Sequence, residues 1–169
     1  MLGALLLALG AMWPASGSAQ PTAPQADSIV LERSLCFGTC PAYRLSLART
    51  GRVHFESRNP GDSGRTASDS IAPEAISRLL WRAVDIGFFD LPELIERDRR
   101  LCPDSATDHP HATVTIFLVG TPKRVRDYLG CYLSSNHATA DALPPLRAFE
   151  AAIDSTAGSA RWRRPARRP

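Results

Sequence analysis

The sequence lacks the short motifs that mark several common kinds of active site. No HExxH, CxxC or GxSxG pattern occurs, and no glycine-rich phosphate-binding loop is present. These absences argue against the metal, dithiol, nucleophilic and phosphate-binding sites that such motifs build. No other stretch assembles a convincing active site, so we expect no catalytic residues and no cofactor.

Long apolar runs are also scarce. Only residues 2–13 form one, and this run is too short to span a bilayer comfortably. It is followed by small residues, with Gly17 and Ala19 at the positions that a signal peptidase reads. We therefore expect residues 1–19 to be a signal peptide and residues 20–27 to be a flexible leader. This interpretation predicts a periplasmic or secreted protein with no transmembrane segment in the mature chain.

Positive charge is concentrated at one end of the chain. The formal net charge is +3, but five of the 20 basic residues are arginines within the last nine positions. Without them, 15 basic side chains face 17 acidic ones, so the rest of the chain is slightly acidic. We expect residues 159–169 to be a disordered tail that could contact anionic surfaces of the cell envelope. Nucleic acid is not an expected partner for an exported chain.

Alternation of apolar and polar residues predicts the first strands. In residues 28–35 the apolar positions share one side, although Arg33 breaks the pattern. Residues 43–47 and 53–55 alternate on either side of a turn, which is typical of a β-hairpin. Residues 59–70 are rich in turn formers, and their second half can add a polar edge strand.

The apolar period changes after this segment and predicts helices. Pro73 suits a first helical turn and Gly87 a stop, and between them one helical face is apolar, formed by Ile76, Leu79, Leu80, Ala83 and Val84. Residues 113–119 are dense in β-branched side chains and predict a central strand, with residues 124–129 as its more polar partner. A second, short amphipathic helix is expected to end near Gly158.

The order of these elements predicts the fold class. Residues 94–111 are polar and irregular, which indicates a long connection. The resulting order is β-β-β-(β)-α-β-β-α, and hairpins dominate it. We expect one α+β domain over residues 28–158, with a mainly antiparallel sheet of about five to six strands and two helices packed on one face.

Four cysteines in an exported chain suggest two disulfide bonds, with three possible pairings. Cys36 and Cys40 are close enough to join across a turn, and Gly38 supplies the flexibility that such a small ring needs. Cys102 and Cys131 then pair by elimination. In the chain-entropy model the small ring contributes about 2 kcal/mol to stability and the larger one about 3.5 kcal/mol.

A thiol-based metal or redox site is the alternative. The stretch from Cys36 to Pro41 resembles the copper-delivery motif of Sco-type thioredoxin-fold proteins, in which two thiolates and a distant histidine hold the metal. Thiolates favour Cu(I), and His109 or His111 could complete a site with Cys36 and Cys40. In those proteins the motif opens a helix, whereas residues 42–48 here continue as a strand. The context therefore favours a structural disulfide.

Several stretches together resemble one family, the small exported bacterial domains catalogued as the domain of unknown function DUF6438. The resemblance covers residues 29 to about 162. It is carried by Cys36-Phe37-Gly38-Thr39-Cys40-Pro41 with Tyr43, Gly51-Arg52-Val53, Gly64, Ile71, Pro73-Glu74, Leu79-Leu80, Phe88-Phe89, Leu91, Asp108, Lys123, Val125, Tyr128 and Ile153-Asp154. The resemblance implies that the first cysteine pair is usual and that Cys102 and Cys131 are an addition. It implies no activity.

Two functions are consistent with the sequence. The first is an exported, non-catalytic, disulfide-stabilised domain that binds an unknown protein or small ligand in the cell envelope. The second is a copper-binding or redox protein that uses the two thiols of the CxxxCP motif. A count of free thiols separates them, because a structural disulfide leaves none.

Overall fold

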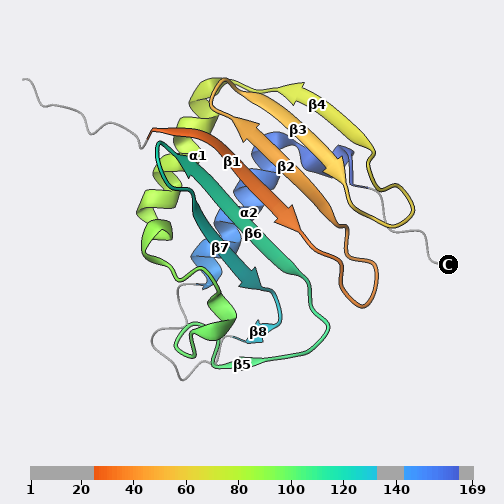
Figure 1. The fold of residues 1–169 in the computed structure, drawn as a ribbon, viewed down its shortest axis with the longest axis vertical. Helices are drawn as coiled ribbons and strands as arrows, with labels where there is room; N and C mark the ends of the chain where they lie inside the picture. The colour runs from red at the N-terminus through yellow and green to blue at the C-terminus, as the bar shows by residue number, and fades with distance from the viewer. Residues whose placement is uncertain (1–24, 133–142, 164–169) are drawn as a thin grey trace, which may run out of the picture.

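The computed structural model describes residues 25–132 and 143–163. Within these ranges the chain forms a six-stranded antiparallel sheet with strand order β4-β3-β2-β1-β6-β7 (Figure 1). A second, two-stranded sheet pairs β5 with β8. The elements are β1 Ala26–Arg33, β2 Tyr43–Ala48, β3 Arg52–Ser57, β4 Thr66–Ser70, α1 Pro73–Asp85, β5 Asp104–Ser105, β6 His111–Leu118, β7 Lys123–Tyr128, β8 Cys131–Tyr132 and α2 Leu143–Ala157.

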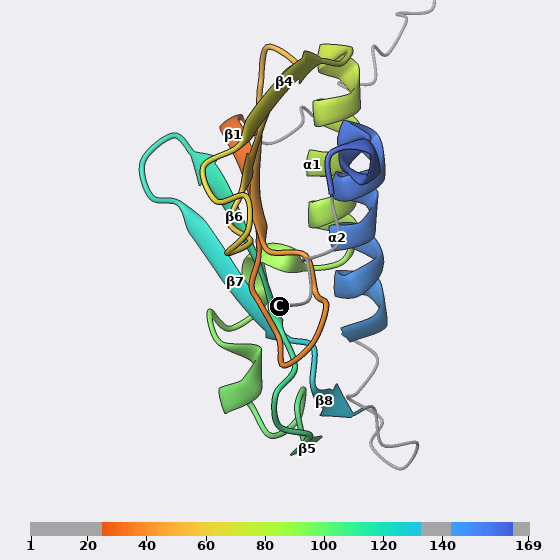
Figure 2. The same ribbon diagram turned by 90° about the vertical axis from the view of Figure 1, so that its right-hand side faces the viewer.

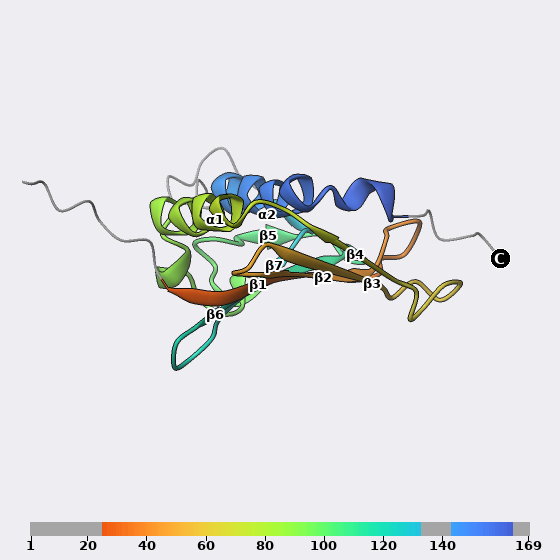
Figure 3. The same ribbon diagram turned by 90° about the horizontal axis from the view of Figure 1, so that it is seen from above.

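Both α-helices cover the same face of the large sheet, and no α-helix of the described residues lies on the other face. Figure 2 shows the sheet edge-on with α1 and α2 to one side, and Figure 3 shows the same two layers from above. This arrangement confirms the predicted α+β class, the mainly antiparallel sheet and the placement of the helices. None of the described helices is both long enough and apolar enough to cross a membrane.

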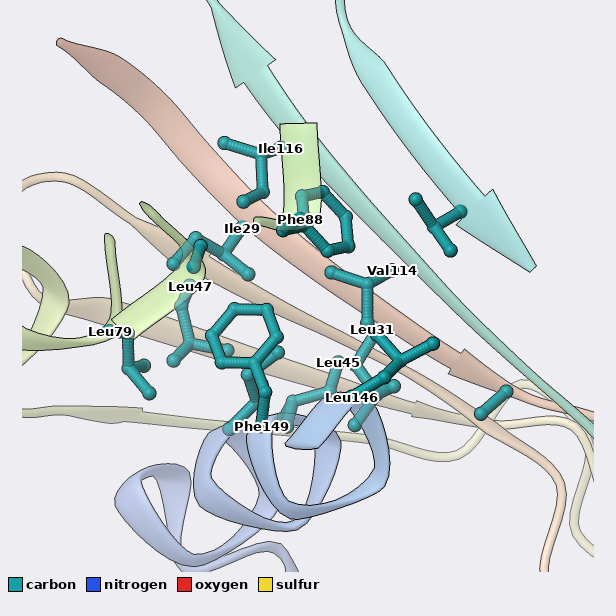
Figure 4. Close-up of a cluster of buried hydrophobic side chains, with 14 of the residues drawn as sticks. Ile29, Leu31, Leu45, Leu47, Leu79, Phe88, Val114, Ile116, Leu146 and Phe149 are labelled. Carbon is teal, nitrogen blue, oxygen red and sulfur yellow. The ribbon is translucent and has the colours of Figure 1, made fainter. Parts of the chain in front are cut away.

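The hydrophobic core lies between the helices and the inner face of the sheet. Alternate residues of β1, β2 and β6 point to this face, and helical residues spaced three and four apart pack against them (Figure 4). The central members are fully or almost fully buried, namely Ile29, Leu31, Leu45, Leu47, Leu79, Phe88, Val114, Ile116, Leu146 and Phe149. Burial of this apolar area supplies most of the favourable free energy of folding.

One turn depends on a glycine. Gly51 links β2 to β3 with a φ of 87°, a left-handed conformation that L side chains rarely adopt. A Cβ atom at this position would lie 2.0 Å from the backbone oxygen of Ile71. The residue after β4 therefore packs directly on this turn, which leaves no room for a side chain.

The inner face of the sheet becomes polar at one end. The strand register places Arg33 beside Ala112 on one side and Tyr43 on the other, and then continues to Ser57 and Asp127. Arg33 therefore points to the same face as Ile29 and Leu31, so it continues the alternation instead of breaking it.

The folded part is longer at both ends than the sequence predicted. Strand β1 begins at Ala26, inside the expected leader, and Ala26 is 2% exposed. Beyond α2, Ser159–Arg161 form a 3-10 helix, and the ring centroid of Trp162 lies 5.6 Å from that of Phe55. The prediction that disorder starts at residue 159 is therefore wrong for residues 159–163. Residues 164–169 and the expected signal peptide lie outside the described residues.

The predicted long connection also contains structure. Residues Ile95–Arg97 form a 3-10 helix, and β5 pairs with β8 after it. Ile95 is fully buried, and an isolated parallel bridge joins Leu94 to Arg126 of β7. Ile95 and Cys102 are therefore buried within a segment whose sequence is mainly polar.

Candidate functional site

The first disulfide bond closes the connection between β1 and β2. Cys36 and Cys40 are bonded, with their Cα atoms 5.6 Å apart, and we call residues 36–40 the disulfide loop. The backbone N–H of Phe37 donates to the carbonyl oxygen of Asp108 at 3.2 Å. The Phe37 side chain is nevertheless 93% exposed, more than any other large apolar residue of the described chain.

The second disulfide bond is buried and lies at the small sheet formed by β5 and β8. Cys102 and Cys131 are bonded, with their Cα atoms 5.1 Å apart, and they are 7% and 3% exposed. The bond ties the long connection to β8, where Ser105 pairs with Cys131. No free cysteine remains among the described residues.

The structure brings the histidines of the alternative metal site near the disulfide loop but does not group them as ligands. The His109 and His111 rings both lie against Tyr128, with centroid distances of 6.5 and 4.9 Å. The sulfurs of Cys36 and Cys40 are bonded to each other. Within the described ranges, no three His, Cys, Asp or Glu side chains are placed to hold a metal ion. This geometry gives no support to the copper alternative.

A buried polar network joins the end of the sheet to α2. We define it as Arg33, Tyr43, Glu150, Asp154 and Ser159. Nε and Nη2 of Arg33 both donate to Oδ2 of Asp154 at 3.1 Å, and Nη1 donates to Oε2 of Glu150 at 3.3 Å. Oδ1 of Asp154 accepts from the hydroxyls of Tyr43 and Ser159, each at 2.6 Å.

Burial shifts the ionisation of this network. It raises the pKa of Glu150 to about 8, against the opposing effect of Arg33. It also raises the pKa of Tyr43 to about 12, and the negative charge of Asp154 acts in the same direction. Asp127 lies close by on β7, and burial raises its pKa although Nε of Arg147 donates to it at 3.0 Å. At neutral pH, Glu150 is therefore mostly protonated.

A cleft of about 560 Å³ opens above the network, and we call it the α2 cleft. Its lining comes from the end of β1, the disulfide loop with the next residue, the segments next to β6 and β7, and the C-terminal half of α2 with the turn after it. Its lining residues are Arg33, Ser34, Cys40, Pro41, Pro110, Leu129, Ala151, Asp154, Ser155, Gly158, Ala160 and Arg163. The walls are mainly apolar, and charged groups lie at the floor and rim.

A second hollow of about 550 Å³ lies on the uncovered face of the sheet. Arg58, Arg124 and Arg126 line it, with His111 and the short side chain of Thr113. Several of its charges are paired, because Arg58 lies 3.5 Å from Glu32 and Arg126 pairs with Glu96. We regard it as a polar solvent-facing surface.

Sequence reasoning identified the disulfide loop but missed the charged floor of the cleft. In the sequence Arg33 breaks the apolar alternation of a strand, and Arg163 falls in the stretch predicted to be a disordered tail. Tyr43 and Asp154 did belong to the family resemblance, but nothing local shows that they meet across 111 residues. A stripe of acidic residues on the second helix, at positions 150 and 154, was the one available signal.

Comparison with known proteins adds a family and no activity. A family model described as a domain of unknown function, DUF6438, matches residues 27–156. This range includes both disulfide bonds and all of the polar network except Ser159. A search of curated proteins finds no match.

Proposed function

This chain belongs to the DUF6438 family, a domain of unknown function, and we propose that it is an exported, non-catalytic, disulfide-stabilised domain that binds a ligand in the α2 cleft. One observation carries the proposal. A cleft of about 560 Å³ with mainly apolar walls and a few convergent charged groups has the size and composition of a ligand-binding site.

The disulfide loop supports the same assignment. It forms one wall of the cleft through Cys40, and a covalent bond restricts its conformations before any ligand arrives. A restrained loop loses less conformational entropy on binding than a free one. Phe37, at 93% exposure on this loop, offers additional apolar surface for contact with a ligand or the molecule that carries it.

The hydroxyl groups of the cleft favour binding over catalysis. Among the lining residues, Oγ of Ser34 donates to the carbonyl oxygen of Leu35, and Oγ of Ser155 donates to that of Ala152. The lining contains no histidine. His111 contacts Ser34 through its backbone N–H, which donates to Oγ at 2.8 Å, and among the described residues no hydrogen bond joins either serine to an imidazole base of the kind that activates a nucleophile. Asp154 is occupied by Arg33, Tyr43 and Ser159.

The disulfide bonds support export, because such bonds persist in oxidising compartments. The proposal predicts that the full chain, expressed in a bacterial host, yields a mature protein that begins at Gln20. Mass spectrometry of the periplasmic fraction and the medium measures this. An uncleaved protein confined to the cytoplasm would contradict export.

Binding can be tested without knowledge of the natural ligand. A library of water-soluble fragments, both neutral and charged, is screened by NMR against the oxidised protein, and the amide shifts of each hit are mapped. We expect several hits to shift residues 33–41 and 151–163. A screen in which no hit maps to these residues would refute the binding function.

A further inference from the structure

We propose that the ligand of the α2 cleft presents a carboxylate next to an apolar group, and that Arg33 and Arg163 donate hydrogen bonds to that carboxylate. This inference rests on the proposed binding function and specifies the chemistry of its ligand. It follows from which hydrogen-bonding groups of the cleft are already used and which are not.

Arg33 lies at the floor of the cleft, and not all of its N–H hydrogen-bond donors are used. A guanidinium carries five N–H bonds. Three donate within the described structure, two to Oδ2 of Asp154 and one to Oε2 of Glu150. The side chain is 18% exposed and lines the cleft, and two of its N–H bonds have no partner among these hydrogen bonds.

The carboxylate oxygens of Asp154, at the floor of the cleft, already accept hydrogen bonds within the protein. Asp154 receives four hydrogen bonds, two at Oδ2 from Arg33 and one each at Oδ1 from Tyr43 and Ser159. Four is about the full capacity of a carboxylate. A ligand that brings only donors therefore finds no free partner on this residue, whereas a ligand that brings acceptors can pair with Arg33.

Arg163 adds a second guanidinium at the rim. Its side chain forms no ion pair with a described carboxylate, yet its charge reaches the network, since it lowers the pKa of Tyr43 against the larger effects of burial and Asp154. The lining thus contains two guanidinium groups and one carboxylate, that of Asp154. Glu150 beneath them is mostly neutral at pH 7. The surplus of one positive charge matches a monoanion.

The walls define the rest of the ligand. Pro41, Pro110 and Leu129 flank the floor, and Ala151 and Ala160 face them from α2 and the turn after it. These residues offer apolar surface. An apolar substituent of a few carbon atoms beside the carboxylate would therefore gain binding free energy by moving from water onto this surface. The C-terminal half of α2 carries the negative end of the helix dipole, which opposes any anion and opposes a phosphate dianion more strongly than a monocarboxylate.

The test uses matched probes in NMR titrations of the oxidised, full-length mature protein. N-acetyl-alanyl-leucine is compared with its C-terminal amide, which differs only in the carboxylate. 4-Methylpentanoate represents a free small acid, and inorganic phosphate represents a different anion. We expect at least one of the two acids to bind in the cleft roughly tenfold or more tightly than the amide, because charge-assisted hydrogen bonds are the stronger kind. We expect phosphate to bind no more tightly than the amide.

Two variants connect this preference to the structure. Arg163→Ser should weaken binding of the acid by roughly tenfold and leave the amide unchanged. Arg124→Ser, on the opposite face of the sheet, is the matched control and should change neither. Arg33 is left intact because it holds α2 to the sheet. Unequal losses for acid and amide are the result that a purely structural role of Arg163 would not produce.

The outcomes are separable. Binding of the peptide acid alone indicates the C-terminal residue of a polypeptide, and binding of 4-methylpentanoate alone indicates a free acid; both support the inference. If acid and amide bind equally in the cleft, or if phosphate binds more tightly than either acid, the ligand class is refuted while the binding function stands. If neither these probes nor any fragment maps to the cleft, the proposed function itself fails.

Discussion

Glu150 should make the stability of the protein fall as the pH rises, and the variant Glu150→Gln should remove this dependence. Burial raises the pKa of Glu150 to about 8 in the folded state, from an ordinary value of 4.5 that applies when the chain is unfolded. Between these two values the folded state holds a proton that the unfolded state has lost. The contribution of Glu150 to stability is therefore largest below about pH 4.5, decreases as the pH rises, and levels off above about pH 8.

The size of the effect follows from the same shift. A pKa difference of about 3.5 units, at 1.36 kcal/mol per unit, corresponds to a loss of about 5 kcal/mol between acidic and alkaline pH. Glutamine resembles the protonated acid in shape and charge, and its side-chain oxygen can still accept the Nη1 hydrogen bond of Arg33. The variant should match the wild type near pH 4.5 and exceed its stability by up to about 5 kcal/mol at pH 9.

Urea unfolding of the oxidised protein at several pH values between 4.5 and 9, followed by circular dichroism, measures both proteins. Asp127 also has a raised pKa, and its charge contributes to raising that of Glu150, so the difference between the two curves reports Glu150 together with its coupling to Asp127. The opposite view holds that the charged Glu150 stabilises the fold through its ion pair with Arg33. A variant that is less stable than the wild type at pH 9 would show that view to be correct, and two curves that stay parallel would show that the pKa of Glu150 is not raised on folding.

Three further predictions concern the disulfide loop and the core. The air-oxidised protein should contain no thiol that reacts with Ellman's reagent, and bound copper after purification would contradict the structural role of Cys36 and Cys40. Mild dithiothreitol followed by alkylation and mass spectrometry should label the partly exposed pair Cys36–Cys40 before the buried pair Cys102–Cys131; simultaneous labelling would show that global unfolding limits both. Phe37→Ser should change stability by less than about 0.5 kcal/mol because its side chain is exposed, whereas Phe55→Ala, at 1% exposure, should cost about 3–5 kcal/mol in thermal or urea unfolding. A large loss for Phe37→Ser would mean that the loop packs on the domain.

The regular elements were predictable because their signals are local. The alternation in β2 and β3 and the helical spacing of apolar residues in α1 are set by neighbours a few positions apart, so a single sequence shows them. The fold class followed, because consecutive hairpins leave few arrangements of the sheet. Pro144 and Pro145 lie in the first turn of α2, where the missing N–H groups cost little.

The charged floor of the cleft could not be predicted because its signals are non-local. Arg33 binds Glu150 and Asp154, which are 117 and 121 residues away in the sequence. No pattern near Arg33 indicates that its oppositely charged partners lie on α2. An arginine in a strand is more often exposed than buried, so the local reading favoured a break in the pattern. Arg163 was missed for a related reason. Its segment has no periodicity of its own, and it is ordered by Trp162, which contacts Phe55.

All four cysteines precede the second helix, so the disulfide bonds cross-link the sheet and its loops but not α2. Both cross-links lie within residues 36–131, so one backbone cut between Tyr132 and Leu143 would leave the C-terminal piece attached to the sheet by packing and polar contacts alone. The domain is therefore divisible into a cross-linked platform and a dissociable helical fragment. The affinity with which these two pieces recombine would report directly on the contacts that Phe149 and Asp154 make.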